Sequence, residues 1–256
     1  MRNFYERIFK EKNATREEIT NFLNDCLNYV FEYHNLDIEE YSITLHPTKT
    51  KYLDDADAKV EQDEKDLKKF DVYFDDNFLS FKGTRKDKKA SKKAKERIFQ
   101  DEREYMADFL NFIYTMFHEF HHIIQFIKQP KVMKDWETTK FSIKKLAQNI
   151  NSFDQSKEEQ QKILSALDAH EDAMSYVSRI EREANKKGHE YLTKTLDYLI
   201  FVERDPELQN FFCSVYTYAN AIRKDEFYFY RKYNKINADQ LEILKHFNIN
   251  TENLLS

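Results

Sequence analysis

The sequence predicts a mainly α-helical fold with a small β-sheet, an α+β arrangement. The 256 residues include only 2 Gly and 3 Pro, where average usage of about 7% and 5% would give roughly 18 and 13. Long segments carry apolar residues at helical spacing, and only short runs alternate as strands do. Glycine-rich phosphate loops, dinucleotide fingerprints and turn-rich sandwiches are excluded, because they need residues that tolerate positive φ.

The first predicted helix begins after Thr15, which forms a capping-box pattern with Glu18, and runs to about His34. The second spans about Asp101 to Lys128 and ends before Pro130. Apolar residues surround most of its circumference, so we expect it to be the central helix of the core. Further helices are predicted over Met133–Ser152, from Ser156 to a C-cap at Gly188, over Glu190–Val202, from Pro206 onward, and over Ala238–Phe247.

The predicted sheet is small. Tyr41–His46 is predicted as a short strand before Pro47. Phe70–Phe74 and Phe78–Lys82 are predicted as a hairpin with a tight turn between them, and Gly83 ends it. We expect this hairpin to pack on the central helix.

Two charged segments lie on either side of the hairpin. Residues 54–66 carry seven acidic side chains against two lysines and are predicted as a solvated loop. Residues 85–97 carry eight basic side chains against Asp87 and Glu96 and are predicted as an exposed loop or frayed helix start. Contact with nucleic acid or an acidic partner is the alternative for the basic segment. The net charge of -5 argues against nucleic acid as the main ligand.

The composition indicates a globular chain, because 41% of the residues are hydrophobic and 15% are aromatic. We expect a single domain over residues 1–256. Cys26 and Cys213 lie far apart, and the N-terminal residues hold no apolar signal core, so the expected compartment is the reducing cytoplasm. No apolar run reaches the 18 to 20 residues that cross a bilayer, and no membrane span is predicted.

The strongest motif is His118-Glu119-Phe120-His121-His122, which fits the pattern H-E-x-x-H. Residues four apart on a helix project from one face, so His118 and His122 can bind one ion while Glu119 reaches its open side. The composition of this chain predicts only about 0.02 such matches by chance. Buried imidazoles and carboxylates need partners, and a metal ion supplies one.

Three other interpretations of the motif are weighed. The histidines can be satisfied by hydrogen bonds inside a helical core. A di-iron bundle would use Glu119 and His122, but it needs E-x-x-H from two helices, and no other Glu stands three residues before a His. A zinc deaminase needs C-x-x-C, which the two distant cysteines do not provide.

A further segment must supply the third protein ligand. In Glu181-Arg182-Glu183-Ala184-Asn185, the apolar helix face centres near Ala184, with Glu181 about 60° and Glu183 about 100° away. Glu181 therefore points nearer the core. His170 lies on the same helix face as Glu181. It can be a metal ligand or a supporting partner of the site, and its default interpretation is a core histidine. Glu171 is a rival candidate for the third ligand.

Together, the hairpin, the H-E-x-x-H helix and the later E-x-E-A-N segment resemble the ImmA/IrrE-type zinc metallopeptidases, a gluzincin-like family. The resemblance covers about residues 40–190, a zincin-like core, and leaves about 191–256 as a helical C-terminal extension. It implies that His118, His122 and Glu181 bind Zn²⁺. It also implies that Glu119 is the catalytic base and that Asn185 supports the site one turn further on. The 58 residues between His122 and Glu181 require an inserted helix around 141–150.

The expected function is that of a zinc-dependent metallopeptidase, in which Glu119 activates metal-bound water to hydrolyse peptide bonds of a protein substrate. The resemblance also implies coupling to a regulator. The alternative is a non-catalytic or regulatory metal-containing helical protein that binds a protein, acidic or nucleic-acid partner. The sequence leaves the substrate and the oligomeric state open. Tyr176, His189 and Tyr230 are oxyanion-stabilising candidates by residue type only.

Overall fold

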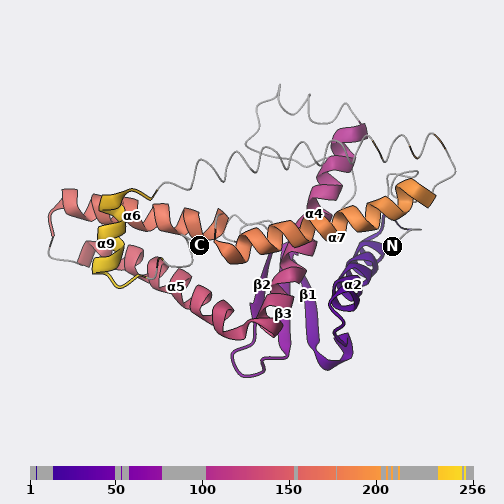
Figure 1. The fold of residues 1–256 in the computed structure, drawn as a ribbon, viewed down its shortest axis with the longest axis horizontal. Helices are drawn as coiled ribbons and strands as arrows, with labels where there is room; N and C mark the ends of the chain where they lie inside the picture. The colour runs from indigo at the N-terminus through magenta and orange to yellow at the C-terminus, as the bar shows by residue number, and fades with distance from the viewer. Residues whose placement is uncertain are drawn as a thin grey trace. The chain divides into compact units, whose positions relative to one another are not determined.

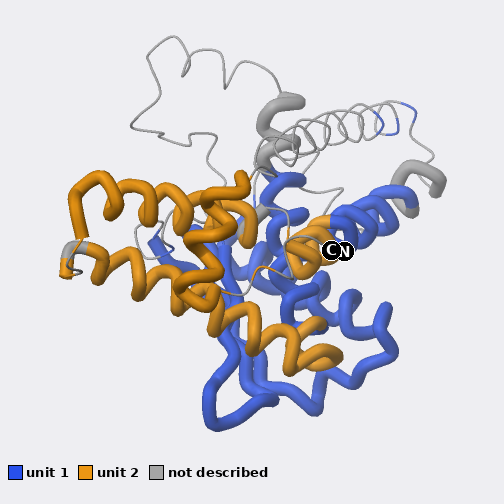
Figure 2. The backbone as a smooth tube through the Cα atoms, turned by 60° about the vertical axis from the view of Figure 1, so that its left-hand side comes forward, with its two compact units in different colours: residues 1–124, 186–221 blue, residues 125–185, 222–256 orange. Residues whose placement is uncertain are grey.

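The structure, a computed structural model, describes residues 14–49, 58–76, 102–152, 155–176, 178–202 and 236–249, and the single residues Phe4, Leu53, Pro206, Gln209, Cys213 and Thr251. The described chain is mainly helical with one three-stranded sheet (Figure 1), so the α+β prediction is confirmed. It forms two compact units, residues 1–124 with 186–221 and residues 125–185 with 222–256 (Figure 2). The expectations of a single domain and of a core ending near residue 190 stay predictions.

Helix α2 (Arg16–Tyr33) matches its prediction closely. The Thr15 side chain accepts a hydrogen bond from the Glu18 amide, and the Glu18 side chain bonds back to the Thr15 amide, so the capping box is present. Its buried stripe has the predicted helical spacing: Ile19, Phe22, Leu23, Cys26, Leu27, Val30 and Phe31. A short 3₁₀ helix, η1 (Ile38–Glu40), leads from α2 into the sheet.

The sheet consists of β1 (Ser42–Thr48), β2 (Ala58–Gln62) and β3 (Lys69–Asp75) in the order β1-β3-β2. β1 runs parallel to the central strand β3, and β2 runs antiparallel to it. The core side of β3 carries Phe70, Val72 and Phe74, all fully buried. Pro47 lies in the edge strand β1, where a missing amide hydrogen costs no ladder bond on the open side.

The prediction of a loop over residues 54–66 is wrong for 58–62, which form β2. The many charged residues of this segment masked its alternating pattern of apolar and polar side chains. The apolar residues Ala58 and Val60 pair with Phe74 and Val72 of β3. A central strand buried on its core face needs hydrogen-bond partners along both edges, and β2 satisfies one of them. The predicted second hairpin strand 78–82, Gly83 and the basic segment 85–97 lie outside the described residues.

Helix α4 (Glu102–Lys128) is the predicted central helix, and the prediction is confirmed. Phe112 meets Phe74 of the sheet with ring centroids 6.0 Å apart, and Phe109 meets Phe22 of α2 at 6.2 Å. Pro130 stands at the start of α5 (Pro130–Asn149), where its missing amide hydrogen breaks no helical bond. The 3₁₀ helix η4 (Ile150–Ser152) follows α5. None of the described helices is both long and apolar enough to cross a membrane.

The single predicted helix from Ser156 to Gly188 is wrong, since it divides into α6 (Lys157–Tyr176) and α7 (Arg179–Val202). Ser178 begins α7, because its hydroxyl accepts a hydrogen bond from the Glu181 amide at 3.3 Å. α7 then runs unbroken through Gly188. The prediction of a C-cap at Gly188 and of a separate helix from Glu190 is therefore also wrong.

The second unit contains a helical core of its own, formed by α5, α6 and α9 (Ala238–His246). α9 was predicted correctly and begins with a capping box between Asn237 and Gln240. His170 of α6 is fully buried, as its default interpretation requires, whereas Glu171 is exposed. The apolar core is made by Ile143, Ile150, Ile163, Ala166, Leu167, Ala173, Met174, Leu244 and Ile249.

Gly188 lets α7 approach the backbone of α4. A Cβ atom at this position would lie 3.0 Å from the amide nitrogen and 3.2 Å from the Cα atom of His118, and 3.3 Å from the carbonyl oxygen of Tyr114. Any side chain larger than hydrogen would therefore press on main-chain atoms. The close approach, rather than helix capping, accounts for the glycine.

A polar cluster ties α2 to α7 within the first unit. The Tyr33 hydroxyl donates a 2.5 Å hydrogen bond to the Glu190 carboxylate, which also pairs with Lys187 at 2.9 Å and Lys194 at 3.0 Å. The hydrogen bonds from Tyr33 and Lys187 are the main causes that lower the pKa of Glu190 to about 2. The charged form of Glu190 thus stabilises the contact.

Replacing Gly188→Ala should destabilise the protein by about 1–2 kcal/mol. Alanine favours a helix by about 1 kcal/mol over glycine, but here its methyl group would meet backbone atoms that cannot rotate away. Urea denaturation followed by circular dichroism measures the difference. Lys186→Ala, at an exposed position on the same helix, is the matched control and should change stability by less than about 0.5 kcal/mol. A Gly188→Ala protein at least as stable as wild type would contradict the close approach.

Replacing Glu190→Gln should cost about 1 kcal/mol at pH 7, because the carboxylate is partly exposed and its ion pairs are screened. The folded-state pKa lies below the unfolded value of 4.5, so the stabilisation is present above pH 4.5 and disappears as the pH falls to about 2. Melting temperatures of both proteins across this range measure it. The exposed Glu171→Gln variant controls for loss of one charge, and a constant wild-type advantage down to pH 2 would rule out the role of Glu190.

Candidate metal centre

The candidate site lies in the C-terminal half of α4, where residues 119–126 form an unbroken buried stretch. Phe117, Phe120 and Ile123 are fully buried around it. Glu119 is 8% exposed and His122 is 4% exposed, so polar groups occupy a position that apolar packing would normally fill. Such groups are tolerated inside a protein only when they are paired or bind a metal.

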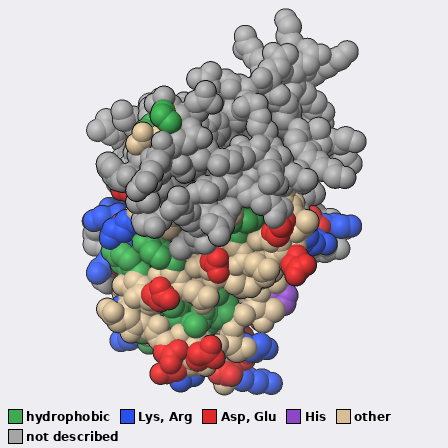
Figure 3. Space-filling view, turned by 90° about the vertical axis from the view of Figure 1, so that its right-hand side faces the viewer, with side chains coloured by type: hydrophobic (Ala, Val, Ile, Leu, Met, Phe, Trp, Pro, Cys, Tyr) green, Lys and Arg blue, Asp and Glu red, His purple; other side chains and the backbone are tan. Residues whose placement is uncertain are grey.

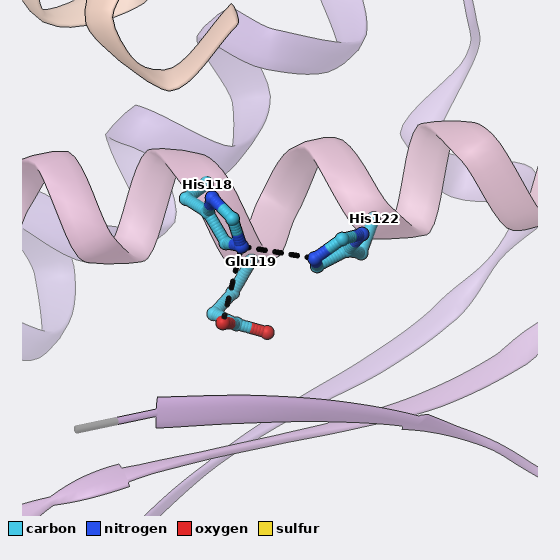
Figure 4. A group of neighbouring side chains, drawn as sticks. All are labelled: His118, Glu119 and His122. Atoms are coloured by element: carbon cyan, nitrogen blue, oxygen red, sulfur yellow. Dashed lines mark hydrogen bonds and ion pairs between the residues drawn. The ribbon is translucent and has the colours of Figure 1, made fainter. Parts of the chain in front are cut away.

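His118, Glu119 and His122 come together as the motif predicts. Each offers one ligand atom, and these atoms lie within 4.8 Å of one another. The Nε2 atoms of the two histidines are 2.9 Å apart, and Nε2 of His118 lies 3.9 Å from a carboxylate oxygen of Glu119. Figure 4 shows all three side chains on the same side of α4, directed toward the strands.

This donor set fits a metal ion. Two nitrogen ligands at about 2.05 Å from a tetrahedral zinc ion lie about 3.3 Å apart, so the rings need to separate by only about 0.4 Å. At the present 2.9 Å the two nitrogens share one proton at most. Imidazole and carboxylate ligands suit Zn²⁺ and other divalent first-row metals.

His121 lies between the two candidate ligands in sequence, but its side chain contacts Tyr191 of α7 instead of the candidate metal site. Burial, followed by the charges of His34 and His122, lowers the pKa of His121 to about 2. It is therefore neutral at physiological pH. Its Nδ1 lies 2.8 Å from the Tyr191 hydroxyl, and the same hydroxyl lies 2.6 Å from Nε2 of His34.

Sequence reasoning missed the hydrogen-bonded chain His34–Tyr191–His121. The three residues belong to α2's C-cap, α7 and α4, and Tyr191 is 157 positions from His34. No periodicity or short motif joins positions so far apart. The only available signal was an additional histidine inside the motif, at a position that the metal does not require.

Glu181 is buried in the first turn of α7, at 7% exposure, while Glu183 is more exposed. The prediction that Glu181 points nearer the core is confirmed. The turn is held by Gln125 of α4, whose amide donates to the Ile180 carbonyl oxygen at 3.1 Å and to the Glu183 carboxylate at 3.2 Å. The helix N-terminus also favours a negative charge at Glu181.

The identity of the third ligand stays a prediction. Glu181, Glu171 and His170 belong to the second unit, whereas His118, Glu119 and His122 belong to the first. Of the oxyanion-stabilising candidates, His189 has its Nδ1 3.2 Å from the Thr193 hydroxyl. The side chain of Tyr176 and all of Tyr230 lie outside the described part of the chain.

The chain was compared with protein-family models, curated proteins and solved structures, and none of them matches it.

Proposed function

We propose that the protein is a zinc-dependent metallopeptidase that hydrolyses peptide bonds of a protein substrate. The observation that carries the proposal is the arrangement on α4, where two imidazole nitrogens 2.9 Å apart stand beside one carboxylate on one side of a buried helix. The resemblance to the ImmA/IrrE-type peptidases in the H-E-x-x-H and E-x-E-A-N segments supports it. Cys26 and Cys213 form no disulfide bond, and the proposal keeps the reducing cytoplasm as the expected compartment.

In this proposal His118 and His122 hold the zinc ion through neutral nitrogens, with Glu181 as the predicted third ligand. When bound, zinc polarises the peptide carbonyl group and lowers the pKa of water. The Glu119 carboxylate takes a proton from the attacking water and delivers it to the leaving amine. One C–O bond forms and the C–N bond breaks, so no covalent intermediate with the protein is needed.

The roles of Glu119 and His122 are separated by two variants. Glu119→Gln should keep one zinc per chain, measured by mass spectrometry of the metal, and should slow cleavage by at least about 100-fold. His122→Ala should lose both zinc and cleavage. Cleavage is assayed on a mixture of synthetic peptides in ¹⁸O-labelled water, where hydrolysis adds one label to each new carboxyl group.

Glu137→Gln, at an exposed position on α5, is the matched control and should behave as wild type. A Glu119→Gln protein that cleaves at the wild-type rate would refute the assignment of the base.

The third ligand is tested by zinc affinity, measured in competition with a chromophoric chelator. Glu181→Ala should weaken binding by more than about 100-fold, above the 10- to 100-fold loss typical of partners outside the ligand set. Glu171→Ala should leave the affinity unchanged, because Glu171 is exposed. The opposite pattern would assign the ligand to Glu171, and a loss only with His170→Gln would assign it to His170.

A second candidate function is that of a regulatory, non-catalytic metal-containing protein that binds a protein partner. The exposed face of α5 favours it, because Phe141 is 68% exposed and shares that face with Lys134 and Lys145. Figure 3 shows a different view, in which acidic and basic side chains of the described residues lie among small apolar areas. One bound zinc with no peptide cleavage would favour this candidate.

A further inference from the structure

We propose that Tyr191 is a positioning residue for the candidate metal centre. Its hydroxyl group, by bonding His121, fixes the rotation of α4 about its own axis and so sets the directions of His118 and His122. This inference rests on the proposed metal site, and it is independent of whether the site cleaves peptides.

The Tyr191 hydroxyl occupies a position where both of its hydrogen bonds are defined. Tyr191 is fully buried, and its oxygen lies 2.6 Å from Nε2 of His34 and 2.8 Å from Nδ1 of His121. A hydroxyl carries one proton, so it donates to one imidazole and accepts from the other. A buried hydroxyl without these bonds would be costly, so the two histidines hold it in place.

The ring of Tyr191 is held as firmly as its hydroxyl. It packs against Tyr29 at 6.3 Å, Tyr33 at 5.2 Å and Phe117 at 5.7 Å between ring centroids. These contacts come from both α2 and α4. The hydroxyl is therefore a fixed point to which the side chain of His121 is attached.

A second contact lies one turn away on both helices. Gly188, three residues before Tyr191, allows α7 to touch the backbone of His118, three residues before His121. The glycine sets how closely α7 approaches α4, and the Tyr191–His121 bond sets how α4 is rotated.

The required precision makes such a constraint useful. His121 projects about 100° around the helix from His122, so its hydrogen bond to Tyr191 restrains the rotation of α4 directly beside the site. A rotation of α4 by about 10° moves an atom about 6 Å from the helix axis by about 1 Å. Metal–ligand distances tolerate only about 0.2 Å. Because His118, Glu119 and His122 move together with α4, such a rotation changes their distances to a third ligand on another helix and so weakens binding.

Tyr191→Phe removes the hydroxyl and keeps the ring. We expect it to lower zinc affinity by about 3- to 10-fold, less than the 10- to 100-fold loss for partners that bond a ligand directly. The visible absorption spectrum of the Co²⁺-substituted protein should change in position or intensity, because it reports ligand geometry. Both are measured on the full chain at a temperature where circular dichroism shows it folded.

Tyr33→Phe is the matched control. It also removes a hydrogen-bonded hydroxyl from the same aromatic cluster, but Tyr33 bonds Glu190 and Lys194 rather than α4. It should leave the zinc affinity and the Co²⁺ spectrum as in wild type, even where it lowers the melting temperature. A merely structural role of Tyr191 predicts the same result for both variants.

His121 provides the complementary test. His121→Phe, which cannot form the hydrogen bond, should reproduce the loss seen with Tyr191→Phe. His121→Asn should retain affinity within about twofold, because its side-chain amide occupies the place of Nδ1. Wild-type affinity and spectrum in Tyr191→Phe, an equal loss in Tyr33→Phe, or no metal binding by the wild-type chain would each overturn the proposal. Metal binding without peptide cleavage would leave it standing and refute only the peptidase function.

Discussion

The structure of the first unit depends on the burial of two imidazoles, His121 and His122, and of the Glu119 carboxylate in the C-terminal half of its main helix. Removing such groups from water costs several kcal/mol each unless partners replace the solvent. α4 accommodates them because apolar neighbours occupy the rest of its circumference, with the sheet and α2 meeting it at Phe112 and Phe109. α7 supports the same turn through Gly188 and Tyr191. The site is thus held by packed elements rather than by loops.

Much of the fold follows from local signals in the sequence. The capping box at Thr15 and the apolar circumference of α4 correctly place two helices, and the expected terminal helix from Ala238 matches α9. The errors have one physical origin, because tertiary contacts overrode local chemistry. β2 forms within an acidic segment because β3 needs a partner, and Ser178 starts a new helix where the apolar spacing continued without a break. Gly188 looks like a helix C-cap in the sequence, but in the structure it allows α7 to lie close to the backbone of α4.

The candidate site was predictable to a different extent for each residue. His118, Glu119 and His122 lie within two turns of one helix, so helical geometry alone brings them together. The orientation of Glu181 also follows from helical angles, and its burial agrees. Tyr191 could not be found in this way, because its partners His34 and His121 lie on helices distant in sequence. Helical geometry brings together candidate ligands on one helix, whereas the contacts that hold that helix come from the tertiary structure.

The discontinuity of the first unit has a consequence for synthesis on the ribosome. Its N-terminal part ends at residue 124, and α7 returns to it only from residue 186 onward, after the chain of residues 125–185 has been made. At about 5–20 residues per second, the 70 positions from His121 to Tyr191 take roughly 4–14 s to translate. During that time α4, with its histidines, has emerged without the helix that packs on it. The helix that packs on α4 is thus made later, so the contacts of Gly188 and Tyr191 with the candidate metal centre can form only late in synthesis.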